Sequence, residues 1–191
     1  NQAFYNHQYN IGIERPIRIN PDSVSMEYVP VTIFAHTVRL DDMRKRYYEQ
    51  SVEKDFYVNT YLPLTETNDT ASLLKLSNRV SVSMAEEFNK WLKFGLTAYL
   101  ENDYLRYGYL IDSVLTHRNH SNTRVGGVLS KNRGDLLRYN ISGELTFLGP
   151  KAGDMMLDGN LSSYFNLFKQ KINLIAHGYV KRQNPSEFLN F

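Results

Sequence analysis

Cysteine is absent from this 191-residue sequence. Its absence excludes a disulfide scaffold, a thiolate metal site and a cysteine nucleophile. A large charge of one sign is also lacking, because 22 lysine and arginine residues are balanced by 20 aspartate and glutamate residues, for a formal charge of +2. A chain so nearly neutral has no general attraction to polyanions, and we therefore expect no nucleic-acid partner.

Long apolar runs are missing as well. No stretch approaches the roughly 20 consecutive apolar residues that a membrane-spanning helix needs. The motifs of common enzyme sites are also absent: Gly-x-Ser-x-Gly, a phosphate-binding loop and His-Glu-x-x-His. The sequence therefore predicts no helical membrane span, no enzyme activity and no cofactor.

Aromatic residues and alternating segments are what the chain does contain. It has 14 tyrosines and 10 phenylalanines but a single tryptophan. Between Leu74 and Met84 the even positions are apolar except for Asn78, whereas the odd positions are lysine, serine or arginine. Successive side chains of a strand point to opposite faces, so this segment has one apolar and one polar face.

The same alternation returns later in the chain, in 92–101 after a polar turn at 86–90, and in 137–148, 157–167 and 172–180. Further strands are expected over 9–15, 28–40, 56–62 and 125–130, and residues 104–115 are expected to extend the strand 92–101 outward. Longer loops are expected at 117–123 and 149–154, and they alternate with short connections at 86–90, 132–135 and 169–171. The sequence thus predicts eight or nine strands and no helix.

Two hypotheses about the fold explain this pattern. Alternating segments of about ten residues, with short and long connections in turn, are typical of an antiparallel transmembrane β-barrel of the outer-membrane type. A half-buried strand in a soluble antiparallel sheet alternates in the same way. The alternative is therefore a soluble secreted or periplasmic β-barrel or β-sandwich that binds a ligand in its interior.

Three segments are similar to a known family: 28–37, 86–99 and 142–149. On these segments the chain resembles the porin family of Bacteroidetes outer membranes, most specifically in the Phe88-Asn-Lys-Trp91 turn and the strand that follows. The resemblance implies an outer-membrane location and contact with membrane lipid. It also implies passive passage of small solutes or ions, or a role as the barrel subunit of an envelope complex. Family members are longer, so 1–191 is expected to be one segment of a larger barrel, with homo-oligomers or other outer-membrane proteins as partners.

The charged positions of the polar faces are the candidate functional residues. In a barrel they would line a water-filled lumen, where rings of charge set the preference for ions and solutes. In a soluble sheet they would form the solvated face. These pore-lining candidates are Lys75, Arg79, Lys93, Glu101, Arg138, Glu144 and Asp158.

Two local features have simpler interpretations. His117 and His120 lie in an expected polar loop with no carboxylate at ligand spacing, so an exposed loop is favoured over a zinc site, and no metal is expected. Pro30 has no backbone N–H to donate, which restricts the start of its strand to a sheet edge, a bulge or a first strand position.

Overall fold

The computed structural model contains one antiparallel sheet and no helix in its described part, residues 1–20, 23–50, 66–86, 93–111, 114–133, 136–168 and 170–185. None of these ranges therefore contains a helix long and apolar enough to cross a membrane. Every strand pairs with its neighbours in the chain, in the order β1 to β8. The strands are β1 (Gln2–Asn20), β2 (Ser23–Gln50), β3 (Glu66–Met84), β4 (Gly95–Ile111), β5 (Val114–Lys131), β6 (Leu137–Leu148), β7 (Met155–Leu167) and β8 (Gln170–Arg182).

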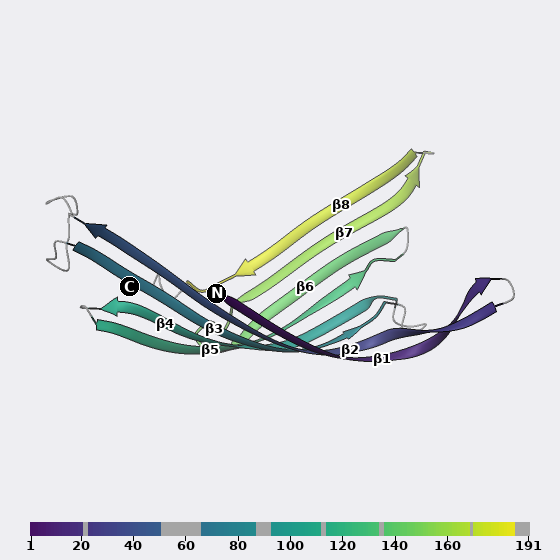
Figure 1. The fold of residues 1–191 in the computed structure, drawn as a ribbon. Coiled ribbons are helices and arrows are strands. Elements are labelled where there is room, and N and C mark those ends of the chain that lie inside the picture. The colour runs from purple at the N-terminus through teal and green to yellow at the C-terminus, as the bar shows by residue number, and fades with distance from the viewer. Residues whose placement is uncertain are drawn as a thin grey trace.

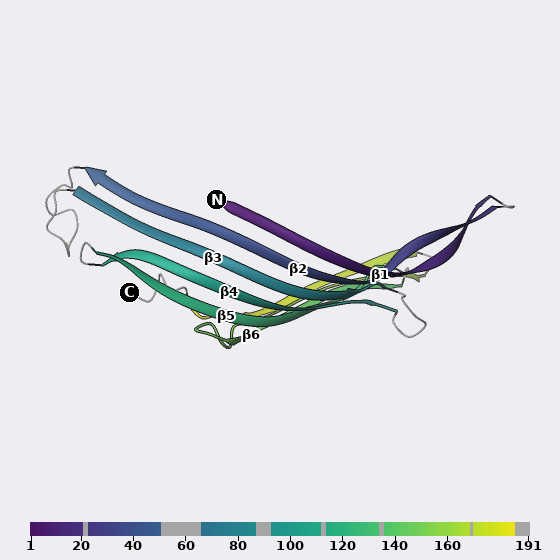
Figure 2. The same ribbon diagram turned by 60° about the horizontal axis from the view of Figure 1, so that its bottom comes forward.

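The sheet is an open, strongly curved trough (Figure 1). Its edges are β1 and β8, which do not pair with each other within the described ranges. Figure 2 shows that the hairpins β2–β3 and β4–β5 extend past β6 at one end of the trough. The all-β antiparallel fold class is confirmed, and an open sheet of eight strands is compatible with a segment of a larger barrel.

Cross-strand register keeps the two faces of the sheet chemically separate. On the concave face Arg79 of β3 lies opposite Glu101 of β4, which lies opposite Arg124 of β5. An apolar row crosses the convex face from β3 to β6: Val80, Leu100, Val125 and Leu145. Because side chains alternate with a period of two, a slip of one residue would exchange the faces, so the pattern specifies the register strongly.

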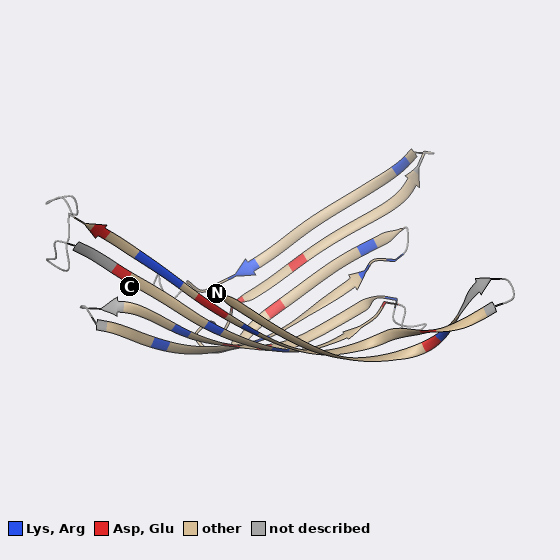
Figure 3. Ribbon diagram, viewed as in Figure 1, with Lys and Arg blue, Asp and Glu red and all other residues tan. Residues whose placement is uncertain are grey.

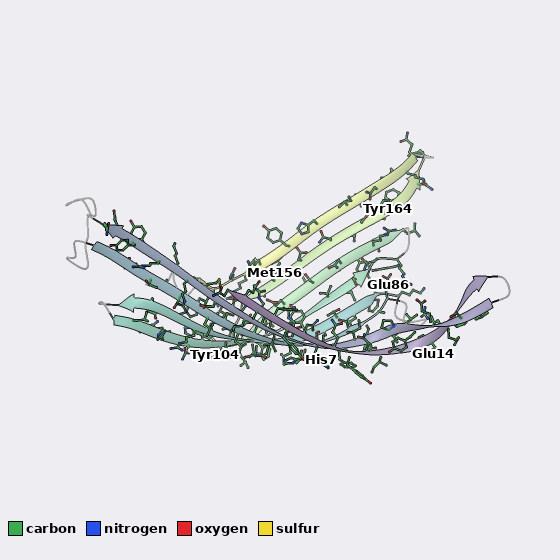
Figure 4. The ribbon with its side chains drawn as sticks, viewed as in Figure 1. His7, Glu14, Glu86, Tyr104, Met156 and Tyr164 are labelled. Carbon is green, nitrogen blue, oxygen red and sulfur yellow. The ribbon has the colours of Figure 1, made fainter. Side chains whose placement is uncertain are left out.

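Burial is the reverse of the pattern in a soluble protein. The buried side chains in the described part of the chain are mostly polar: Asp41, Ser77, Glu101, Asp103, Asn122 and Thr146, with Val31, Leu105, Tyr107 and Tyr109 as the apolar ones. Apolar residues of the convex face are exposed, including Val80 at 59% and Leu174 at 53%. Figure 4 shows Tyr104 on the convex side and Met156 on the concave side. The sheet therefore has a polar interior and an apolar exterior.

Pro30 lies at a β-bulge. The register between β1 and β2 shifts between Ile11 and Gly12, which leaves Val31 without a partner on β1. Val31 is 4% exposed, and its carbonyl oxygen accepts the backbone N–H of Ala85 at 2.8 Å. The expectation that Pro30 needs a bulge, an edge or a first position is confirmed, because the regular hydrogen-bond ladder is interrupted there.

Two expectations about the connections are wrong. Residues 117–123 are not a loop but part of β5, which is joined to β4 through 112–113 alone. Connection lengths therefore do not alternate between the rims, since β3 and β4, at the other rim, are joined by the longer segment 85–94. The expected strand 56–62 lies outside the described residues. Residues 117–123 deviate from the period of two because both faces of β5 are polar there.

Candidate functional site

A set of six charged side chains crosses the middle of the concave face, and we call it the charged cluster. Its members come from four adjacent strands, β3 to β6. Antiparallel register brings them together from distant parts of the sequence. The charged cluster consists of Lys75, Arg79, Glu101, Asp103, Arg124 and Glu144.

Arg124 of β5 is the centre of the charged cluster. Its Nη2 donates to Asp103 Oδ2 at 2.6 Å and also to Glu101, and its Nη1 donates to Glu144 Oε1 at 3.2 Å. The fixed fork of the guanidinium N–H groups allows one arginine to serve several acceptors at once. Its side chain is 24% exposed, so these interactions are partly shielded from water.

Two cations of β3 balance the carboxylates. Lys75 Nζ lies 3.0 Å from Asp103 Oδ2, and Arg79 forms an ion pair with Glu101. Between them Ser77 donates its hydroxyl to Asp103. Three cations and three carboxylates make the charged cluster formally neutral. We therefore expect it to stiffen the concave face more than to create a field of one sign.

Tyr99 of β4 contacts two members of the charged cluster, and it reaches across β5 to contact the one on β6. Its hydroxyl donates to Glu144 Oε2 at 2.7 Å, and Arg79 Cζ lies 4.2 Å from the centroid of its ring. Gly126 of β5 lies between Tyr99 and Glu144 in the register. A Cβ at Gly126 would lie 2.2 Å from Tyr99 Cζ, so the glycine provides the space in which the ring reaches β6.

Gly126→Ala is expected to lower the free energy of unfolding by about 1–3 kcal/mol, because the added methyl group displaces the Tyr99 ring and its bond to Glu144. Gly143→Ala is the control, since its Cβ would meet only Leu157 Cδ1 at an ordinary 3.6 Å. Less backbone freedom in the unfolded chain should leave the control unchanged or more stable by up to about 1 kcal/mol. Denaturant unfolding compares the two variants, and equal stability would contradict the role of Gly126.

The structure brings four of the seven pore-lining candidates together: Lys75, Arg79, Glu101 and Glu144. The other three lie apart from the charged cluster. Arg138 of β6 lies with its Cζ 5.7 Å from the Tyr164 ring centroid, and Asp158 of β7 lies 2.8 Å from His177 Nε2. Lys93 precedes β4 and is exposed. None of these three contacts the charged cluster.

Two members of the charged cluster are not among the sequence candidates. Asp103 is 7% exposed and bound by Lys75 and Arg124. Arg124 falls between the expected loop 117–123 and the expected strand 125–130. A signal for Arg124 exists only if 114–131 is treated as one strand, because alternation then places it on the same face as Gly126 and opposite Glu101.

The histidine pair of β5 does not form a shared metal site. His117 and His120 are three residues apart in a strand, so they lie on opposite faces of the sheet. His120 contacts the ring of Tyr107 on the concave side, with the ring centroids 5.7 Å apart. Among the residues that the structure describes, no group of three possible metal-ligating side chains occurs.

Comparison with known proteins gives one match. A family model described as "Putative porin" matches residues 1–191, the whole of the sequence. No curated protein and no solved structure matches the chain. The family match and the polar concave face are thus independent observations about the same residues.

Proposed function

Since the chain belongs to this porin family over its whole length, we propose that residues 1–191 are part of an outer-membrane β-barrel through which small solutes or ions pass. The concave face lines the lumen, and the convex face contacts lipid. On the resemblance of residues 28–37, 86–99 and 142–149 we propose that this membrane is a Bacteroidetes outer membrane.

The reversed burial of the two faces is the observation that carries this proposal. Leu100 of the convex face is 51% exposed, whereas its neighbour Glu101 on the concave face is 5% exposed. A soluble sheet covers its apolar face with a second layer. All eight strands of the described part of the chain lie in a single layer, which leaves the convex face uncovered. Lipid is the solvent that suits such a face.

The dimensions of the apolar band support the same assignment. On β6 the convex face runs from Tyr139 to Phe147 with apolar residues and a glycine between them. At about 3.3 Å per residue this segment is about 26 Å long. A strand tilt of about 40° reduces its height to about 20 Å, close to the apolar band of about 25 Å in such barrels. The two aromatic residues lie where interfacial girdles are expected.

A polar row marks one border of the band. Asn78, the exception on the apolar face of β3, lies opposite Asn102 of β4. Asn102 Nδ2 donates to Thr123 Oγ1 at 2.9 Å and to Ser121 Oγ at 3.0 Å. Beyond this row β4 continues to Ile111. We therefore place the projecting ends of β4 and β5 in water, outside the membrane.

The open edges of the sheet require further strands in a membrane. Each unpaired backbone N–H or C=O in the hydrocarbon region costs several kcal/mol, and only closed barrels avoid this cost with strands. We propose that β1 and β8 pair with strands of the same barrel that lie outside 1–191. Assembly with other copies or with other outer-membrane proteins stays a prediction.

Cysteine labelling tests the orientation of the two faces, since residues 1–191 contain no cysteine of their own. In the full-length protein, with any other cysteines replaced, Ser142→Cys on the concave face should react with a water-soluble thiol reagent in intact membranes. Ile141→Cys, its neighbour on the convex face, should react only after detergent is added, because lipid covers it. Equal labelling of both variants would reject the barrel orientation.

Passage of solutes is tested separately. The full-length protein in a planar lipid bilayer should produce discrete steps of ionic current. The expected labelling pattern without such steps would retain the barrel and reject the pore.

A further inference from the structure

A cavity of about 330 Å³ opens on the concave face beside the charged cluster. One side is formed by β3 to β6, and the other by the β6–β7 turn and the end of β8. Three of its lining residues are basic and lie outside the charged cluster: Lys151, Lys181 and Arg182. Figure 3 shows the end of β8 as a basic tip. The cavity is therefore lined by strands that are distant in sequence.

The lining of this cavity has a surplus of positive charge. Its acidic residues are Asp103, Glu144 and Asp154. Its basic residues are Lys75, Arg124, Lys151, Lys181 and Arg182. Five cations and three carboxylates leave a formal charge of +2, and the charge is still +1 without Arg182, which pairs with Met155 of the convex face. The cavity thus differs from the charged cluster, which is neutral.

The carboxylates of the lining are already engaged, whereas several cations are not. Asp103 and Glu144 are bound within the charged cluster, and Asp154 Oδ1 accepts the backbone N–H of Asn184 at 2.7 Å. The side chains of the three basic residues outside the charged cluster form no hydrogen bond or ion pair with any described residue. The surplus charge is consequently available to a ligand.

One buried donor adds to this set. Arg124 Nε is buried and has no acceptor within the described ranges, although the two Nη atoms of the same guanidinium are occupied by carboxylates. A buried donor without an acceptor costs about 1–3 kcal/mol, so an acceptor supplied by a ligand or by water would be favourable. Guanidinium and ammonium groups are the side chains that best bind phosphate and carboxylate oxygens.

We propose that this cavity binds the oxyanion group of a solute, with inorganic phosphate as its simplest representative. Lys151 and Lys181 supply the charge, while the carboxylates of the charged cluster hold Lys75 and Arg124 in place. The volume suits a small anion or the anionic end of a larger solute. This inference rests on the proposed function in one respect. The bound solute is taken to be one that passes through the lumen.

Block of current by phosphate tests the site. In the full-length protein in a planar bilayer at constant ionic strength, phosphate should reduce the chloride current in a saturable way. The double variant Lys151→Gln, Lys181→Gln should raise the half-blocking phosphate concentration at least about tenfold, since each cation donates a charge-assisted hydrogen bond. Lys171→Gln, on the same face at the other end of β8, should change it by less than about twofold, because it lies outside the cavity.

Calorimetry separates the failure of this inference from the failure of the pore. Phosphate binding to the detergent-solubilised full-length protein, weakened in the double variant but not in Lys171→Gln, would support the site even if no current steps occur. Current steps that phosphate does not block, or blocks equally in the double variant, would overturn the oxyanion site and leave the pore intact. Phosphate binding is also compared in vesicles with and without phosphate-bearing lipid. This comparison shows whether the bound oxyanion is a free anion or a lipid headgroup.

Discussion

The Leu96→Arg variant is expected to lose about 2–4 kcal/mol of its free energy of unfolding in a lipid bilayer, the cost of an arginine on the lipid face near the midplane. Leu96 lies on the convex face of β4, where it opposes Met84 and Leu129 in the register. A guanidinium at this position would have to stay in hydrocarbon or distort the bilayer to reach water. Denaturant unfolding of the full-length protein in vesicles measures the loss.

Thr97→Arg is the matched control, one residue along the same strand and on the opposite face. Thr97 Oγ1 donates to Ser83 Oγ at 3.0 Å, so its replacement loses one hydrogen bond worth about 1 kcal/mol. In the proposed barrel the new charge would lie in the lumen, where water solvates it, and we expect a change in conductance rather than in stability. Equal destabilisation by Leu96→Arg and Thr97→Arg would contradict the assignment of the faces.

The second large effect is expected at Arg124. Arg124→Met leaves three carboxylates with only Lys75 and Arg79 as cationic partners. Breaking a fully buried ion pair costs about 3–5 kcal/mol. Because Arg124 is 24% exposed, we expect a smaller loss of about 2–3 kcal/mol, measured by the same unfolding experiment. The charged cluster would also acquire one net negative charge, so the pore should become more selective for cations.

Two comparisons make the Arg124 result specific. Arg39→Met removes another arginine of the concave face, which pairs with Asp41 at 2.9 Å but is 52% exposed, and should cost less than about 1 kcal/mol. Glu101→Gln in the Arg124→Met background should restore part of the lost stability, because it removes one of the uncompensated carboxylates. Equal losses for Arg39→Met and Arg124→Met, or no rescue by Glu101→Gln, would argue against a coupled cluster.

The sequence alone predicts much of the sheet and four of the six residues of the charged cluster. Alternation over Leu74–Met84 and 137–148 assigns Lys75, Arg79 and Glu144 to the polar face, and the structure has them there. Period-two alternation is readable in these segments because one face contacts an apolar environment and the other a polar one. That difference is a property of each segment, so no partner strand is needed to detect it.

Residues 117–123 could not be assigned in this way. Polar residues occupy both faces of β5 from His117 to Thr123, the residue that pairs with Asn102 of β4. No alternation therefore distinguishes a strand from a loop there. Arg124 lies next to this stretch, and its contacts depend on the register between β4 and β5. That register places Glu101 opposite Arg124. Pairing of this kind is a tertiary property, and composition does not contain it.

The strict meander order of the sheet has a consequence for how fast it forms. Within the described ranges each of the eight strands pairs with the strands before and after it in the chain, so each ladder is expected to begin at a connection and to grow outward residue by residue. Chains dominated by contacts between near neighbours fold faster than those that must close long loops first. We therefore expect hairpins such as β4–β5, with two residues between its strands, to nucleate early, and the remaining strands to add one at a time to an existing edge.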